Sequence, residues 1–463
     1  MLTEIELELD QIKEMIHNKQ HKELREYLDT LTPQDIAEIM EELVEDDEIT
    51  YEQLPRFYRL LPKDLAADTF VELDPDLQEE LIKALTDREI KQVMDDMFVD
   101  DAVDVIEEMP ANVVKRMLSN ADAETRRNIN EILNYPEDSA GSIMTIEYMD
   151  LHTDMTVKEA FDYIRKNGME KETINILYVT ERRKLVGLCS VRDLLLSQYD
   201  DKIKDIMEED AIFVHTTDDK ELVAQVLAKY DFTAIPVVDN DDRLVGIVTV
   251  DDAIDVITEE ATEDIEKMAA ITPSEHPYLR SSVFEIWKQR IPWLLLLMVS
   301  ATFTGMIITK FEDALAAQVA LTAFIPMLMD TGGNSGSQAS VTIIRGLSLG
   351  DIDLGDILKV IWKEFRVSIL CGLALSVVAF GKIMLVDHLL MNNTDITPLV
   401  AAVVSLTLVV TVIIAKLVGC TLPILAKRLG FDPAVMASPF ITTIVDALSL
   451  MIYMTLASLM LNL

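Results

Sequence analysis

Cysteine, histidine and catalytic motifs are scarce in this 463-residue sequence. Its three cysteines (Cys189, Cys371 and Cys420) lie far apart and form no CxxC pair, so neither a disulfide framework nor a thiolate metal site is supported. The six histidines lack the spacing of metal ligands. There is no HExxH or GxSxG motif and no catalytic Cys/His pairing, and no GK[ST] follows the glycines at 332–336, which excludes a P-loop. We therefore do not expect an enzyme.

Positive charge is also in short supply. Against 81 acidic residues the chain has 40 lysines and arginines, which gives a net charge of −41. Residues 1–270 hold 68 of the acids and 28 of the bases, whereas residues 271–463 are almost neutral. Such a surface repels polyphosphates, so nucleic acid is not an expected partner, and it attracts cations. A surface that only keeps the protein soluble is the alternative.

The N-terminal region lacks the apolar core of a secretory signal, so we expect it to stay in the cytosol. Residues 1–135 contain few strand formers, and apolar residues recur there at helical spacing. Three similar segments recur along this region: DIAEIMEEL at 35–43, DLAADTFVEL at 64–73 and DDAVDVIEEM at 100–109. They predict an acidic, all-α N domain in which helix pairs stack into a superhelix.

Residues 136–260 contain an internal duplication. The segment NILYVTERRKLVGLCSVRDLL returns, at an offset of 59 residues, as AIPVVDNDDRLVGIVTVDDAI. Both copies read as a strand, a charged turn, a second strand and a helix. We therefore predict an α/β module made of two βαββα-like units that pack face to face.

Residues 251–290 are predicted to form a helical connection to the C-terminal region. Acidic residues at steps of three, four and four place four carboxylates on one helix face: Asp252, Asp255, Glu259 and Glu263. Asp251 and Glu260 add to this charge. Because like charges four residues apart destabilise a helix, bound divalent ions or a basic partner would relieve the repulsion. A solvated acidic face is the alternative.

Long apolar runs occur only beyond residue 290. Five of them meet the length of about 20 residues that crosses a bilayer: 292–309, 315–345, 367–386, 397–420 and 433–461. Basic residues cluster before the first run and in the second–third and fourth–fifth connections, which predicts a cytosolic N-terminus and a C-terminus outside the cell. Residues 291–463 are therefore predicted to form a plasma-membrane domain of five helices.

Asp446 is the one charged residue after Asp432, and it lies within the last apolar run. A charge at the centre of a membrane helix costs about 2.5–3.5 kcal/mol on insertion scales, so it persists where function or a partner offsets the cost. With Ser438, Thr442 and Ser449 it forms a polar stripe, whose oxygens suit a hard divalent cation. We expect Asp446 to lie in an ion path. The alternative is an interhelical hydrogen-bond seam with a protonated aspartate.

The stretch PMLMDTGGNSGSQAS at 326–340 interrupts the second apolar run. Its proline, three glycines and polar side chains are expected to unwind a helix, which is tolerated at membrane depth only beside protein or a water-filled cavity. Freed carbonyls, together with Asp330 and Asn334, would then line the ion path. Close packing of small residues, as in GxxxG contacts, is an alternative that is compatible with the first.

With these features in order, the chain resembles the MgtE family of magnesium channels along essentially its whole length. The most specific phrases are MDTGGNSGSQAS at 329–340 and DPAVMASPFITTIVDALSL at 432–450, and the domain order of helical N domain, tandem CBS pair, acidic connecting helix and five membrane helices also matches. The resemblance implies a homodimer in the lipid bilayer whose interface forms a pore for Mg²⁺. It places Asp446 in that pore and marks Ser438 and Asp330 as departures from residues found in relatives.

The resemblance also implies regulation. In the family, cytosolic Mg²⁺ bridges acids of the N domain, the CBS pair and the connecting "plug" helix, matched here by 251–270, and thereby closes the pore. Some CBS pairs bind adenine nucleotides such as ATP through a pattern of Gly–apolar–x–Ser/Thr–x–x–Asp. Both copies fit this pattern, with Gly187, Ser190 and Asp193 in the first and Gly246, Thr249 and Asp252 in the second. An ordinary capped helix start has the same spacing, so nucleotide binding stays open.

The leading hypothesis is a homodimeric, Mg²⁺-selective channel that is gated by cytosolic Mg²⁺. The alternatives are a membrane-anchored metal or nucleotide sensor without transport, and a proton-coupled transporter of divalent cations. The glycine-rich stretch and Asp446 favour transport, because a simple anchor needs neither. The residues do not distinguish Mg²⁺ from Co²⁺, Ni²⁺ or Mn²⁺.

Overall fold

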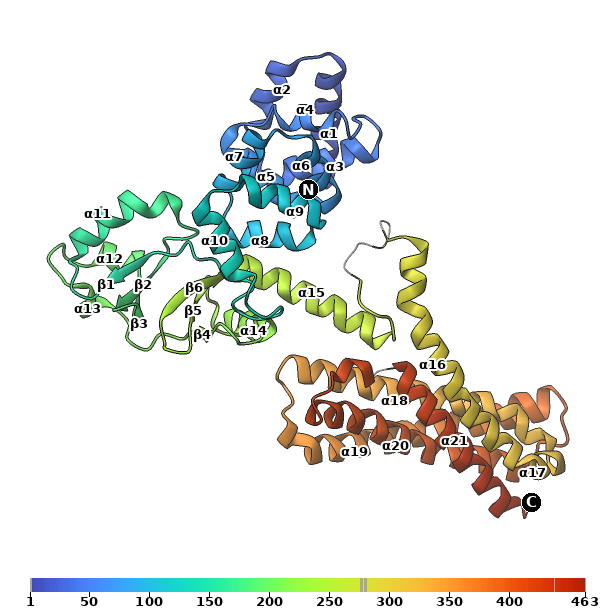
Figure 1. Ribbon diagram of the computed structural model, residues 1–463. Coiled ribbons are helices and arrows are strands. Elements are labelled where there is room, and N and C mark those ends of the chain that lie inside the picture. The colour runs from blue at the N-terminus through green and yellow to red at the C-terminus, as the bar shows by residue number, and fades with distance from the viewer. Residues whose placement is uncertain (1, 275–277, 279–280, 437, 463) are drawn as a thin grey trace. The chain divides into compact units, whose positions relative to one another are not determined.

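The computed structural model describes residues 2–274, 278, 281–436 and 438–462, except for the side chains of residues 2–8, Asp64 and Ser438. The chain divides into two compact units, Met1–Ile257 and Thr258–Leu463, and each is described by itself. In Figure 1 the first unit contains a helical part and a part with strands, whereas the second unit is helical.

The N-terminal part of the first unit is built from short helices. Its described residues form α1 (Leu2–His17), α2 (His21–Leu28), α3 (Pro33–Glu45), α4 (Leu54–Tyr58), α5 (Lys63–Glu72), α6 (Pro75–Ala84), α7 (Asp87–Asp96), α8 (Val99–Glu108), α9 (Ala111–Asn120) and α10 (Ala123–Ile132). Thr32 and Thr86 cap α3 and α7, and a proline opens α3 and α6, which explains why the chain turns so often. One apolar core extends from Leu9 to Ile132. The predicted all-α N domain is confirmed.

The duplicated region forms two small sheets of the same topology. The first contains β1 (Asp150–His152), β2 (Ile176–Glu181) and β3 (Lys184–Ser190), and the second contains β4 (Val214–His215), β5 (Ala234–Val238) and β6 (Leu244–Thr249). In each sheet the first strand is parallel to the second and the second is antiparallel to the third. Tyr178 of the first sheet and Ile247 of the second share one buried cluster. The predicted α/β pair is confirmed.

Helices complete each half of this pair. They are α11 (Val157–Asn167), α12 (Val191–Leu196) and α13 (Ile203–Ile206) in the first half, and α14 (Lys220–Tyr230) in the second. Apolar residues of α11 pack on Leu177 and Val179 of β2, and those of α14 pack on Ile235 and Val237 of β5.

The acidic connection is helical over only part of its predicted range. α15 (Val250–Met268) ends where Ala270 takes a left-handed φ of +54°. Residues 283–290, which were expected to continue this connection, are instead the first turns of α16 (Val283–Lys310). A capping box between Ser282 and Glu285 starts that helix.

The second unit is a bundle of long helices. They are α16, α18 (Ile325–Ser348), α19 (Ile357–Lys382), α20 (Pro398–Arg428) and α21 (Ser438–Leu461), with a short α17 (Glu312–Ala317) before α18. Among the described residues, four segments are long and apolar enough to cross a membrane: 283–310, 354–390, 398–428 and 433–461. α18 has 24 residues, enough for a crossing by length, but its glycines and polar side chains make it less apolar.

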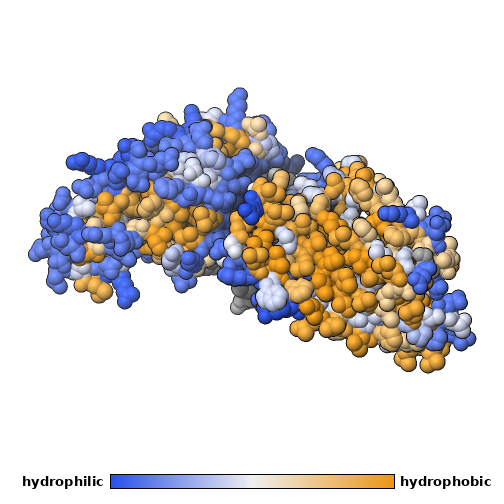
Figure 2. Space-filling model, turned by 90° about the horizontal axis from the view of Figure 1, so that it is seen from below, coloured by the Kyte–Doolittle hydropathy of each residue, from blue (hydrophilic) through white to orange (hydrophobic). Residues whose placement is uncertain are grey.

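Apolar side chains cover much of the surface of the helical bundle, as Figure 2 shows in orange. Val299, Phe303 and Met306 of α16 are each about two-thirds exposed in the single chain. A soluble monomer rarely exposes a continuous apolar surface of this kind, so contact with lipid or another subunit is its natural explanation.

Candidate functional site

The Asp446 carboxylate lies at the contact between α18 and α21. A Cβ atom built on Gly333 of α18 would lie 3.7 Å from Oδ1 of Asp446 and 3.0 Å from Cγ2 of Thr442. Asp446 and Thr442 are half-buried and lie one helical turn apart on α21. The Thr442 hydroxyl donates to the Pro439 carbonyl at 2.9 Å, which leaves the Thr442 oxygen able to accept or to face a cation. A glycine at this contact therefore gives the carboxylate room.

Asp330 and Asn334 lie on an exposed polar face of α18. These two residues and Gln338 follow at steps of four, so they form one stripe along the helix. Asp330 lies one helical turn before Gly333 on α18, and its negative charge acts on Asp446 of the other helix. The structure thus gathers three predicted site residues, Asp330, Thr442 and Asp446, at the α18–α21 contact, with Asn334 one turn further along α18.

The prediction that 326–340 is unwound is wrong, because α18 is helical throughout this stretch. Pro326 stands in the first turn, where a missing backbone N–H removes no helical hydrogen bond. The glycines face neighbouring helices, and a Cβ added to Gly332 would lie 2.7 Å from Oγ of Ser449. Gly336 is enclosed in the same way by α20 and α21. The small residues therefore allow close helix packing, the alternative reading, and the carbonyls stay in the helix.

The remaining members of the predicted stripe on α21 differ from Asp446. Ser449 is buried against α18, and its hydroxyl has no hydrogen-bond partner among the described residues. Ser438 begins α21, but its side chain lies outside the described part of the chain. Ser449 therefore belongs to the helix contact and not to a wet face.

A second group of acids lies in the first unit, where the start of α15 meets α8. Burial and the negative charge of Asp252 raise the pKa of Asp101 to about 7 and the pKa of Asp104 to about 8. Burial raises the pKa of Asp252 itself to about 6. Burial and the charge of Asp251 raise the pKa of Glu172 to about 7. These carboxylates repel one another, and each raises the pKa of its neighbours.

Asp100 is the most strongly affected carboxylate of this group. Its side chain is buried, and Oδ1 has no hydrogen-bond partner among the described residues. Burial and the charge of Asp101 raise its pKa well above the usual value. A buried carboxylate without a partner is costly, so a bound cation would stabilise the site. In the described residues, however, no three acidic, histidine or cysteine side chains stand close enough to hold a metal ion as they are.

The acids of α8 and Glu172 were missed in the sequence analysis. The segment DDAVD at 100–104 carries the signal, because Asp100 and Asp104 lie one turn apart and share a helix face. Among the predicted acids of α15, Asp252 is part of this group, and the charge of Asp251 acts on Glu172 and Asp101. Asp251, Asp255 and Glu259 are exposed, and Glu260 is half-buried.

The C-terminal turns of α15 contact the helical bundle within the second unit. Nζ of Lys267 lies 2.6 Å from Oε1 of Glu263 and 2.7 Å from Oδ2 of Asp432, in the loop before α21. The Ser348 hydroxyl, at the end of α18, donates to Asp264 at 3.1 Å. Burial outweighs this hydrogen bond and raises the pKa of Asp264. The end of α15 is therefore tied to the ends of both helices that carry the Asp330–Asp446 site.

The two Gly–x–x–Ser/Thr–x–x–Asp patterns have a structural role. The side chains of Ser190 and Thr249 each hydrogen-bond the aspartate three residues on, at the start of α12 and α15. Gly187 and Gly246 both lie close to neighbouring backbone. At Gly187, an added Cβ would lie 2.6 Å from the Glu208 carbonyl oxygen. Asp193 is exposed, whereas Asp252 lies among the α8 acids. Helix capping thus accounts for both patterns, and nucleotide binding stays a prediction.

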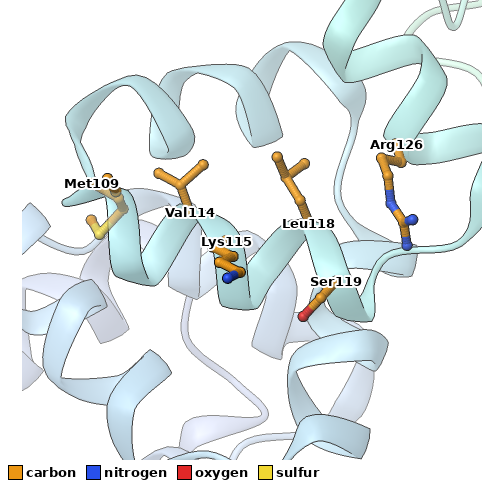
Figure 3. A pocket seen from close by; sticks show the side chains of 7 residues that line it. Met109, Val114, Lys115, Leu118, Ser119 and Arg126 are labelled. Atoms are coloured by element: carbon orange, nitrogen blue, oxygen red, sulfur yellow. The ribbon is translucent and has the colours of Figure 1, made fainter.

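A hollow of about 610 Å³ lies on the N domain (Figure 3). Met109, Val114 and Leu118 form its apolar lining, and Lys115 and Arg126 add positive charge. None of the described residues that line this hollow is acidic, so it does not fit a cation. The candidate ion sites therefore remain the Asp330–Asp446 contact and the α8–α15 acids.

Comparison with known proteins agrees with this arrangement. The family model for MgtE, described as a divalent cation transporter, matches residues 325–456, and models for the MgtE intracellular N domain and the CBS domain match 47–138, 140–199 and 203–259. The magnesium transporter MgtE of Thermus thermophilus is 37% identical over 97% of this chain and 98% of its own length. The magnesium transporter MgtE of Bacillus subtilis is 36% identical over 94% of each chain.

A solved structure gives the same result for the first part of the chain. The crystal structure of the soluble part of a magnesium transporter is 32% identical and superposes with a TM-score of 0.51, covering 56% of this chain and 99% of that one. These relatives are transporters, in agreement with the lack of catalytic motifs. The match over nearly the full length of two relatives, with all three domain models in the same order, shows that the chain belongs to the MgtE family of magnesium transporters.

Proposed function

We propose that this chain moves Mg²⁺ across the cell membrane through a path that passes Asp446. The observation that carries the proposal is the approach of Asp446 to Gly333 and Asp330 at the α18–α21 contact, inside a bundle of otherwise apolar helices. Carboxylate and hydroxyl oxygens are the groups that Mg²⁺, or its bound water, prefers. Asp446 and Thr442 contribute such oxygens from one helix, and Asp330 and Asn334 from the other.

A homodimer fits the polar face of α18. Asp330, Asn334 and Gln338 are exposed in the single chain, although α18 lies in a bundle whose other long helices are membrane-compatible. Lipid tails offer no hydrogen bonds to such side chains, so a water-filled path or a second subunit is needed beside them. Two copies that met along this face would place two Asp446 carboxylates around one hydrated ion. The positive-inside distribution supports a cytosolic N-terminus and a C-terminus outside the cell.

Gating by cytosolic Mg²⁺ is the second part of the proposal. The α8–α15 acids repel one another until cations neutralise them, so Mg²⁺ would draw the N domain and the start of α15 together. At its other end, α15 is tied to α18 and to the loop before α21. A shift of α15 would thus reach both helices of the ion path. Glu263, Asp264 and Asp432 supply carboxylates at which Mg²⁺ would compete with Lys267.

ATP would bind at the first CBS half in preference to the second. Asp193 is exposed there, whereas Asp252 is surrounded by acids that repel phosphate groups. A proton-coupled transporter is the second candidate function, and the nearness of Asp330 to Asp446 favours it, because two close carboxylates share protons readily.

Ion flux into proteoliposomes tests the proposal. Purified full-length protein should carry Mg²⁺ down its gradient, and Asp446→Asn should abolish this flux while the protein still inserts. Flux that persists in the variant would overturn the assignment of the path. Flux that follows an imposed pH gradient, and not the Mg²⁺ gradient alone, would favour the proton-coupled transporter.

A further inference from the structure

A buried ion pair joins α19 and α20 within the helical bundle. Lys416 of α20 is 6% exposed, and its Nζ lies 3.9 Å from Oε2 of Glu364 on α19. That carboxylate oxygen is buried and has no hydrogen-bond partner among the described residues. Both residues lie in segments long and apolar enough to cross a membrane. Charges in such segments are rare and are usually kept for a functional reason.

The inward orientation of Glu364 distinguishes it from its charged neighbours. Lys363 and Arg366 are exposed on the same part of α19, where basic residues are expected near the cytosolic membrane surface. Glu364 instead turns toward α20 and keeps only 14% of its side chain exposed. The preference for basic residues near the cytosolic membrane surface explains Lys363 and Arg366. It does not explain why the Glu364 carboxylate faces the protein interior.

Two of the contacts between α19 and α20 bear on how these helices pack, and the ion pair is the second of them. The first is Gly372, where an added Cβ would lie 3.2 Å from Cα of Val409. Glu364 lies eight residues before Gly372, and Lys416 lies seven residues after Val409. Two helical turns on antiparallel helices therefore separate the two contacts. One contact sets the distance between the helices, and the charges set their register.

Lys416 also lies beside the contact between α20 and α18. A Cβ on Gly419 would lie 2.2 Å from the Gly336 carbonyl oxygen, so neither helix can move closer here. A Cβ on Gly336 would in turn lie 2.8 Å from Ile441 and 3.3 Å from Val445, both on α21. Val445 directly precedes Asp446 in the sequence. The segment of α20 around Lys416 thus supports the place where α18 and α21 meet.

We propose that Lys416 and Glu364 are positioning residues for ion passage. The pair holds α20 in register on α19, and through the Gly419–Gly336 contact it sets the spacing between Asp330 on α18 and Asp446 on α21. The inference rests on the proposed ion path at Asp446. Neither member of the pair touches the ion; each acts through the backbone contacts of α20.

The first test replaces one charge at a time in the full-length protein. Glu364→Gln and Lys416→Gln should raise the Mg²⁺ concentration for half-maximal flux by about three- to tenfold, the range expected when a distant packing contact is altered. They should also lower the preference for Mg²⁺ over Ca²⁺ in proteoliposomes. Lys363→Gln, at an exposed site on the same helix, is the matched control and should behave like the unaltered protein.

Two double variants separate positioning from folding. The exchanged pair, Glu364→Lys with Lys416→Glu, should recover half-saturation and selectivity, because attraction across the contact is restored. Glu364→Leu with Lys416→Leu should yield as much folded protein as the unaltered chain, since an apolar pair often replaces buried charges without loss of stability. Its half-saturating Mg²⁺ concentration should nevertheless stay raised, because leucines do not define the register as charges do.

The outcomes decide between the inferences. Unaltered half-saturation and selectivity per folded molecule in the single variants, or in the double leucine variant, would overturn the positioning role. If Asp446→Asn abolishes flux in the same assay, the proposed path stands and only this inference fails. If Asp446→Asn leaves flux intact, the proposed path itself is wrong.

Discussion

Lys267 joins the end of α15 to the loop before α21, with its Nζ 2.7 Å from Oδ2 of Asp432. The same ammonium lies 2.6 Å from Oε1 of Glu263, one turn earlier in α15. It is the one base in α15, so a single tethered cation balances two carboxylates at the ends of different elements. A divalent cation with the same two carboxylates would have the same effect.

Lys267→Met should therefore weaken closure when Mg²⁺ is scarce. Without the ammonium, Glu263 and Asp432 repel each other, and α15 loses an attachment to the helical bundle. We expect higher Mg²⁺ flux at low cytosolic Mg²⁺ and normal closure at millimolar Mg²⁺, measured in proteoliposomes with defined internal solutions. Lys359→Met removes an exposed pair with Asp356 inside one helix turn and serves as the control. Lower flux at low Mg²⁺ would contradict the role given to Lys267.

Asp446→Asn should abolish Mg²⁺ flux, a loss of more than tenfold, which corresponds to more than about 1.4 kcal/mol of lost ion stabilisation. The amide has the same shape but no charge to balance the cation. Asp330→Asn should have a smaller effect, because Asp330 lies on the exposed side of the contact. Flux of ²⁸Mg²⁺ or an Mg²⁺-sensitive dye inside the vesicles gives the ratio. Equal losses in the two variants would instead make Asp330 a full partner of Asp446.

Gly419→Ala should destabilise the helical bundle. The new Cβ would lie 2.2 Å from the Gly336 carbonyl oxygen, and backbone on both sides cannot yield without separating α18 from α20. We expect a loss of about 1–3 kcal/mol, as for other overpacked contacts, and a lower thermal unfolding midpoint in detergent. Gly305→Ala in α16 meets no atom within 4 Å and should be neutral or up to about 1 kcal/mol stabilising. Equal midpoints for the two variants would disprove the tight contact.

Without divalent cations, the packing of α8 on the start of α15 should weaken as the pH rises. The folded pKa values of Asp252, Asp101 and Asp104 are about 6, 7 and 8, above the ordinary value of 3.8. Because the folded form holds these protons more tightly, its stability is complete below the ordinary pKa and is lost as the pH rises through about 6 to 8. Protease protection of the N domain in EDTA should therefore be greater at pH 5.5 than at pH 8.

Mg²⁺ should restore that protection at pH 8, because ions that bind only the packed form stabilise it by mass action. Asp101→Asn with Asp104→Asn should flatten the pH dependence and reduce the added protection by Mg²⁺. Asp76→Asn, at an exposed position in the first turn of α6, is a control in the same domain. Identical digestion with and without millimolar Mg²⁺ would rule out gating through these acids.

Much of the architecture follows from local patterns in the sequence. The 59-residue duplication predicts two like sheets, because alternating apolar residues and charged turns act over a few residues. The helical spacing of the first 135 residues and the long apolar runs beyond residue 290 are equally local signals. Asp446 could be singled out because a charge within an apolar run is visible without any fold.

The tertiary structure determined features that a local sequence pattern cannot predict. The glycines of 326–340 predict a broken helix when only their own propensity is considered, but packing against α20 and α21 makes their small size an advantage and keeps α18 whole. The gathering of Asp101, Asp104 and Asp252, and the pairing of Lys416 with Glu364, join residues that are tens to more than a hundred positions apart. Sequence by itself determined most of the helices and strands, whereas the contacts between them kept α18 whole and determined which charges meet, since charge interactions depend on distance in space and not along the chain.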